Sequence, residues 1–141
     1  MTHAMFSTGP SGLPIAVVDY QAGVCNIGPD EIRRRRRAGH VGLVAAGALL
    51  ALLVAVGAPP LARLLVAIPA AMAASGYLQA WLKFCAGFGS RGIFNFGQVG
   101  ETHAVIDAEA RARDRSRARQ IGLASLTIGV AVAIIAVLLP L

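Results

Sequence analysis

The amino-acid sequence predicts an all-α integral membrane protein with three transmembrane helices. Of its 141 residues, 56% are hydrophobic and only 14% are charged, and the mean hydropathy is +0.65. The apolar residues gather in three runs, at about residues 38–58, 61–82 and 121–139. Each run is close to the ~20 residues that an α-helix needs to cross the ~30 Å hydrocarbon core of a bilayer. Little of the chain is left over for a water-soluble fold.

The distribution of charge predicts how these helices are oriented. Most of the 13 basic residues lie in two clusters, at residues 33–37 and at alternate positions from 111 to 119, and each cluster precedes an apolar run. Cytoplasmic segments next to membrane spans are enriched in Lys and Arg. We therefore expect a cytoplasmic N-terminus and an external C-terminus in a bacterial inner (plasma) membrane. The clusters are interpreted as contacts to anionic head groups, and nucleic acid is not expected as a partner.

The first 28 residues are predicted to form a flexible cytoplasmic arm, because residues 7–14 are rich in Gly, Pro and Ser. A helix is predicted to begin near Pro29. Asn26 or Gly28 can cap it, proline suits its first position, and the two acidic residues that follow complement the positive end of the helix dipole. Residues 29–141 then form the membrane domain, in which this helix continues into the first span.

The first two spans carry features of close packing and of bending. Small residues recur four positions apart in the first span, as in Gly42/Ala46 and Gly47/Ala51, and this spacing lets helix backbones approach closely. In the second span Pro69 removes a backbone hydrogen bond, which predicts a bend. Arg63, at the outer end of that span, is expected to extend to the membrane surface.

Residues 83–100 are predicted to form an ordered interfacial loop on the cytoplasmic side. Its glycines permit tight turns, and its phenylalanines are too apolar to remain in water, so we expect them to be held against the membrane or another subunit. Arg91 is placed to meet a lipid phosphate or a partner carboxylate. From about residue 101 the chain is predicted to be helical again and to continue into the third span. Acidic residues precede basic ones by four positions there, as in Glu109 and Arg113.

Residue chemistry predicts contact sites but no catalytic residue, metal ligand or cofactor. The spans lack Asp, Glu and Lys, which ion-coupled transporters need. Cys25 and Cys85 are a possible thiol pair; together with His40 and His103 they match no known zinc-ligand spacing. The predicted contacts to lipid or a partner are Arg33, Arg34, Arg35, Arg36, Arg37, Phe84, Phe88, Arg91, Phe94, Phe96, Arg111 and Arg115.

One part of the chain resembles a known family. Asn26-Ile27-Gly28, then Asp30 and Arg33, then an apolar hairpin ending in Phe84-Cys85 and a glycine-bearing loop resemble the small YgaP-like inner-membrane domain over residues 26–97. Members of that family often accompany rhodanese domains, which handle sulfane sulfur. The resemblance implies a compact helical hairpin and, by analogy, a sulfur-handling role for Cys85. This chain differs from the family in having Ala86 in place of the family's proline, a third helix and no rhodanese domain.

Three functions are compatible with these observations. The first is a non-catalytic accessory or assembly subunit of a larger membrane complex, which packs its small-residue helix faces and its cytoplasmic arm against partner subunits. The second is a self-assembling homo-oligomeric pore or scaffold, which uses the same faces to bind copies of itself. The third is a thiol- or sulfur-handling membrane protein that uses Cys25 and Cys85.

Overall fold

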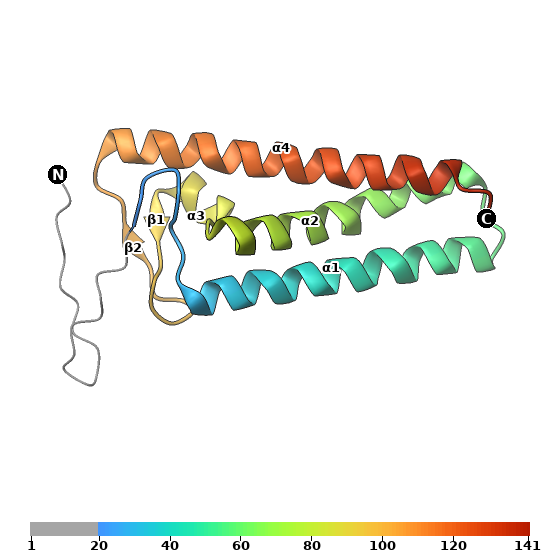
Figure 1. The fold of residues 1–141 in the computed structure, drawn as a ribbon, viewed down its shortest axis with the longest axis horizontal. Helices are drawn as coiled ribbons and strands as arrows, with labels where there is room; N and C mark the ends of the chain where they lie inside the picture. The colour runs from blue at the N-terminus through green and yellow to red at the C-terminus, as the bar shows by residue number, and fades with distance from the viewer. Residues whose placement is uncertain (1–19) are drawn as a thin grey trace.

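The computed structural model describes residues 20–141 and is mostly helical (Figure 1). Within these residues, three helices are long and apolar enough to cross a membrane: α1 (Pro29–Ala55), the 3-10 helix η1 (Pro60–Val66) continuing into α2 (Ala67–Leu82), and α4 (Ala108–Leu138). A short helix α3 (Ala86–Arg91) and two strands of two residues, β1 (Ile93–Phe94) and β2 (His103–Ala104), lie between α2 and α4. Residues 1–19 of the predicted arm lie outside the described residues.

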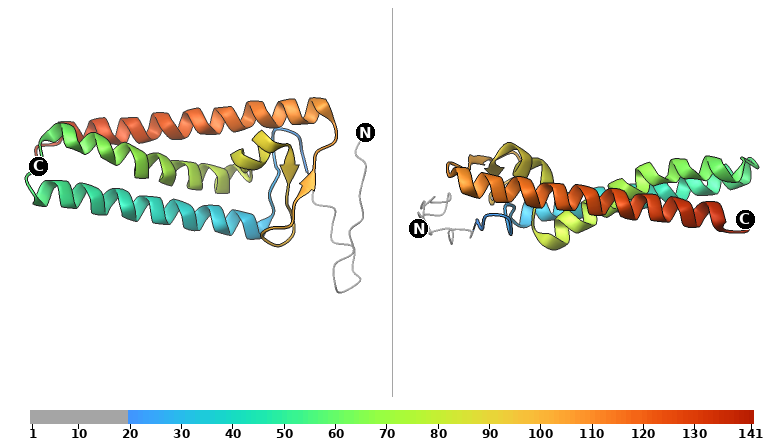
Figure 2. Two further views of the ribbon diagram at one scale, coloured as in Figure 1. Left: turned by 180° about the vertical axis from the view of Figure 1, so that it is seen from behind. Right: turned by 90° about the horizontal axis from the view of Figure 1, so that it is seen from above.

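The three long helices lie side by side, and α2 packs against both α1 and α4 (Figures 1 and 2). The short elements α3, β1 and β2 are at one end, where α1 and α4 begin. We call this end the head; it comprises residues 20–28, residues 83–107 and the first turns of α1 and α4. The loop between α1 and η1 and the end of α4 lie at the opposite end.

The packing of α1 on α2 depends on glycine. Gly39 and Gly76 face each other so closely that a Cβ atom at Gly76 would overlap the Gly39 backbone. One turn further along, a Cβ atom at Gly42 would lie 2.8 Å from Ala73 Cα. Small residues at such a seam allow the two backbones to approach and make extensive van der Waals contact. Of the small-residue pairs noted in the sequence, Gly42 and Ala46 lie in this seam, whereas Gly47 and Ala51 are exposed.

The packing of α4 on α2 follows the same principle. Gly129 lies against Ala67 and Ala71, where a Cβ atom would lie 2.7 Å from the Ala67 carbonyl oxygen. The buried residues of α4 recur every three or four positions, which places them on one side of the helix. In the apolar part they are Ile121, Ser125, Gly129, Ala133 and Ala136. The remaining circumference of this part of α4 is largely exposed.

The helix boundaries confirm one prediction and correct another. The first helix begins at Pro29 after Gly28, as predicted. The last helix begins at Ala108, not at residue 101. The Asp107 side chain accepts a hydrogen bond from the Ala110 amide at 2.9 Å and caps the helix. Residues 103–104 pair in antiparallel fashion with β1, so the segment before Asp107 is extended.

Arg63 differs most from its prediction. Its side chain does not reach the surface but is buried, with 4% of its surface exposed. It donates hydrogen bonds to the backbone carbonyls of Ala136, Leu139 and Leu141 at 2.9–3.0 Å. The last carbonyls of a helix have no partner within the helix, and a planar guanidinium with five donors can satisfy several of them at once. Arg63 therefore joins η1 to the end of α4.

The glycine seam leads to a stability prediction with a matched control. We expect Gly76→Ala to destabilise the protein by about 1–3 kcal/mol, because the added methyl group forces α1 and α2 apart. Gly47→Ala makes the same chemical change at an open position, where the added methyl group would have no atom within 4 Å apart from the adjoining backbone of its own helix. It should be neutral or stabilising by up to about 1 kcal/mol, since alanine is the better helix former. Unfolding of both variants in detergent micelles measures the difference, and equal effects would contradict the seam.

Candidate functional site

The head contains four buried polar side chains that join segments distant in the sequence. Asn26, Asn95 and Asp114 have no exposed surface, and Glu31 is 1% exposed. They come from the chain before α1, the loop after β1, α4 and α1, respectively. Buried polar groups are costly unless they are hydrogen-bonded, so their partners show what holds the head together.

Asn26 binds the turn between α2 and α3. Its side-chain oxygen accepts a hydrogen bond from the Cys85 amide at 2.7 Å, and its side-chain nitrogen donates to the Cys85 carbonyl at 3.1 Å. The Asn26 amide donates to the carbonyl of Lys83, which has the left-handed conformation (φ 54°) at the end of α2. These bonds fix the chain entering α1 against the chain leaving α2.

Asn95 joins the loop after β1 to α1. Its side-chain nitrogen donates to the Gln98 carbonyl at 2.7 Å and to Glu31 Oε1 at 3.4 Å. Its backbone carbonyl accepts from the Gly28 amide at 2.9 Å, and its own amide donates to the Asn26 carbonyl at 3.0 Å. Gly28 is the N-cap residue of α1, and its amide is thus held by Asn95, which lies 67 positions later in the chain.

Asp114 fixes residues 20–25 to α4. The Tyr20 hydroxyl donates to Asp114 Oδ2 at 2.6 Å, and the Gly23 amide donates to Oδ1 at 2.7 Å. The pKa of the Tyr20 phenol is raised, mainly because the side chain is buried and secondly because it donates a hydrogen bond to the Asp114 carboxylate. The prediction of a flexible arm up to residue 28 is therefore wrong for residues 20–28. Hydrogen bonds and the burial of Ile27 attach that stretch to the head.

Cys85 lies in a cluster with three predicted contact residues. Its sulfur accepts hydrogen bonds from Arg35 Nη2 at 2.9 Å and from the Phe88 amide at 3.5 Å. The guanidinium groups of Arg35 and Arg91 lie 5.8 and 5.7 Å from the centroid of the Phe88 ring, within the range of a cation–π interaction. Cys85 is 1% exposed, so its sulfur is a buried acceptor that caps α3. Cys25 is also a thiol, and its sulfur lies 3.8 Å from the Ile27 carbonyl oxygen.

The aromatic loop packs against the rest of the head, and two of its rings have a different environment from the one expected. Phe84 is fully buried and packs in a cluster with Ala118 and Ile121 of α4. Phe88 is also buried, so both rings contact the protein's own core instead of lipid or another subunit. Phe94 stacks on Tyr20 with 5.0 Å between ring centroids, and Phe96 lies beside Phe94. Both of these rings are partly exposed.

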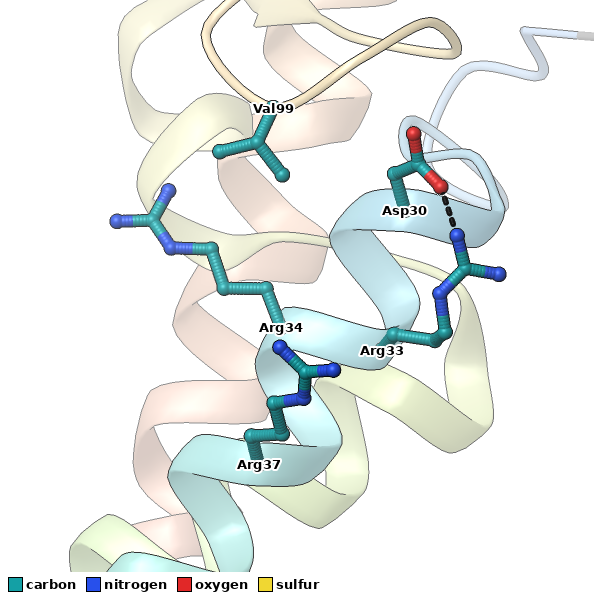
Figure 3. A pocket seen from close by; sticks show the side chains of 5 residues that line it. All are labelled: Asp30, Arg33, Arg34, Arg37 and Val99. Carbon is teal, nitrogen blue, oxygen red and sulfur yellow. Dashed lines mark hydrogen bonds and ion pairs between the residues drawn. The ribbon is translucent and has the colours of Figure 1, made fainter.

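Three of the predicted contact arginines surround one hollow at the start of α1. Arg33, Arg34 and Arg37 line an opening of about 450 Å³ together with Asp30 and Val99 (Figure 3). Arg33 forms an ion pair with Asp30. Arg36, Arg111 and Arg115 are exposed and lie outside this hollow. The predicted site residues thus do not form a single site. Some of the arginines lie on an exposed basic surface, whereas Arg35, Phe88 and Arg91 gather around Cys85. The other phenylalanines pack elsewhere in the head.

Asp114 was not among the predicted site residues, although the sequence carries a signal that its side chain is buried. It lies four residues before Ala118 and seven before Ile121, so it continues the buried side of α4 into the charged half of the helix. An acidic residue on the buried side of a helix, among arginines, indicates a partner elsewhere in the chain. Asn26 and Asn95 lie outside any periodic pattern and have no comparable signal.

Comparisons with known proteins add no relative. The chain matches no protein-family model, and neither the curated proteins nor the solved structures include a significant match. Within residues 20–141, no three His, Cys, Asp or Glu side chains are grouped as a metal ion requires.

The role of Asp114 can be tested by hydrogen exchange. Asp114→Ala leaves the Tyr20 hydroxyl and the Gly23 amide without their acceptor, which should weaken the attachment of residues 20–25 by about 1–3 kcal/mol. We expect faster exchange at Gly23 and faster proteolysis of this segment. Glu109→Ala is the control, because it removes an exposed acid of the same helix that, among residues 20–141, pairs only with Arg113. Equal protection of Gly23 in both variants would contradict the attachment.

Proposed function

We propose that this chain is an integral membrane protein with a cytoplasmic N-terminus that serves as a non-catalytic accessory or assembly subunit of a larger membrane complex. One observation carries the proposal: beyond their arginine clusters, the helices α1 and α4 each bury one side in the helix packing and leave the rest of their surface mostly apolar and uncovered. A surface of this kind is compatible with lipid or with other transmembrane helices, and not with water.

The exposed side chains show the extent of this surface. Val41 and Val44 on α1 are 66% and 70% exposed, and Leu123 and Leu126 on α4 are 67% and 57% exposed. All four lie within helices that are long enough to span a bilayer. An apolar surface that runs along both outer helices is what the hydrocarbon core of a membrane covers.

The charge distribution supports the proposed orientation. The arginine run of α1 and the arginine series of α4 lie in the first turns of helices that both begin at the head (Figure 1). Arg63 lies at the other end of the molecule, and its charge is buried against the end of α4. The exposed basic residues of the described chain are therefore concentrated at the head, which the positive-inside rule assigns to the cytoplasm.

A part of α1 supports binding to another subunit. Gly47 is exposed, and a Cβ atom at this position would have no atom within 4 Å apart from the adjoining backbone of its own helix. Ala51 is also exposed and lies one turn further along the same side of the helix. Small residues four positions apart on an exposed membrane helix allow a second helix to approach closely. The same surface fits a second copy of this chain, which is the homo-oligomer alternative.

The orientation is tested with reporters fused after Leu141. We expect a reporter that is active only outside the cytoplasm to be active there, because an odd number of spans separates this position from the cytoplasmic head. A reporter that fluoresces only in the cytoplasm should be silent at the same position. Fusion of the two reporters after Gly100, in the head, should give the reverse result. Cytoplasmic activity after Leu141 would refute the orientation.

The subunit proposal is tested by crosslinking in native membranes. Ala51→Cys in a Cys25→Ser background places a reactive thiol on the exposed small-residue surface of α1. We expect an adduct with a different protein. An adduct of twice the chain's own mass would instead support the homo-oligomer. Val41→Cys, which is exposed on another side of α1, is the control. The absence of any adduct specific to Ala51→Cys would contradict a helix partner at this surface.

A further inference from the structure

Two hollows follow each other along α1. The first is the basic hollow formed by Asp30, Arg33, Arg34, Arg37 and Val99, with a volume of about 450 Å³ (Figure 3). The second lies immediately further along the helix and has an apolar lining formed by His40, Val41, Val44 and Ala45, with a volume of about 400 Å³.

The two hollows share one side of the helix. Their α1 residues are spaced by three or four positions, from Arg34 through Arg37 and Val41 to Ala45, and residues with this spacing lie above one another on a helix. Gly39 and Gly42 lie on the opposite side, where α2 packs. A basic hollow at the helix start and an apolar hollow one turn deeper have the order of a lipid head group and its acyl chain.

The basic hollow has unused positive charge. Arg33 is paired with Asp30, the acidic residue among the described residues that line the hollow. Arg34 Nη1 lies 3.9 Å from Oε1 of the buried Glu31 carboxylate. The same carboxylate also pairs with Arg35, whose Nη2 lies 3.6 Å from Oε2. No described residue forms an ion pair or a hydrogen bond with the guanidinium of Arg37. Figure 3 shows Arg34, Arg37 and Val99 around one opening, so an anion that enters it meets two guanidinium groups and an apolar wall.

We infer that this side of α1 is a binding site for an anionic phospholipid. Arg34 and Arg37 bind the phosphate, since guanidinium groups form charge-assisted and often bidentate hydrogen bonds with phosphate oxygens. An acyl chain lies in the apolar hollow between His40 and Ala45. The inference rests on the membrane insertion proposed above, and it defines which of the five adjacent arginines bind the lipid. A free phosphate ion shares the head-group chemistry but has nothing to place in the apolar hollow.

The basic part of the site is tested with the purified full-length protein in detergent, by native mass spectrometry or titration with phosphatidylglycerol and, for comparison, phosphatidylcholine. We expect preferential binding of phosphatidylglycerol. Arg37→Gln should weaken this binding roughly fivefold or more, whereas Arg36→Gln, which changes the net charge equally outside the hollow, should weaken it less than about twofold. Equal losses in the two variants would overturn the site, because binding would then follow total charge alone.

The apolar part of the site distinguishes lipid from free phosphate. Ala45→Trp fills the apolar hollow and should reduce phosphatidylglycerol binding, whereas Ala131→Trp, at an exposed alanine of α4, should not. Excess inorganic phosphate should fail to displace the lipid. Displacement by phosphate together with unaffected binding in Ala45→Trp would show that the site takes free phosphate and would overturn the inference.

Carbonate extraction of membranes separates this inference from the proposed function. A chain that resists extraction but shows no preference for phosphatidylglycerol refutes the lipid site and leaves membrane insertion intact. A chain that is extracted refutes the membrane insertion itself.

Discussion

The contact between Gly39 and Gly76 brings α1 and α2 together near the head, and the rest of that region depends on the resulting separation of the two backbones. A Cβ atom at Gly76 would also lie 2.8 Å from the Arg35 carbonyl oxygen, so the close approach extends into the arginine run of α1. Because the backbones are this close, the Arg35 side chain reaches the sulfur of Cys85 beyond the end of α2. Larger residues at this seam would separate the elements that the head joins.

The head combines two kinds of charge that play different roles. Glu31 and Asp114 are buried, and each is bound by groups from other segments, so they act as attachment points within the chain. The exposed arginines around them exceed the available carboxylates, which leaves positive charge on the surface. The buried carboxylates thus hold the head together, while the surplus guanidinium groups are exposed and available to bind anionic groups outside the chain.

The sequence was sufficient to predict the long helices, because their apolar runs have the length of a membrane span and the start at Pro29 carries clear helix-start residues. The structure of the head could not be predicted in the same way. Asn26, Asn95 and Tyr20 form side-chain hydrogen bonds with residues far away in the chain, and such contacts leave no periodic pattern. The burial of Arg63 was missed for a related reason: its carbonyl partners belong to the end of α4, which local reasoning about the second span does not include.

The position of Arg63 also determines when its hydrogen bonds can form as the chain is made. Its three carbonyl acceptors lie 73 to 78 residues further along the chain, so they do not exist when η1 and α2 are first made. In a chain that enters a bilayer as proposed, the early hairpin of α1 and α2 carries a guanidinium without these partners. Arrival of the last helix in the correct register then satisfies that group and closes the outer end. Arg63 therefore makes the first two spans dependent on the third for the carbonyl partners of its guanidinium, although α1 and α4 each pack separately against α2.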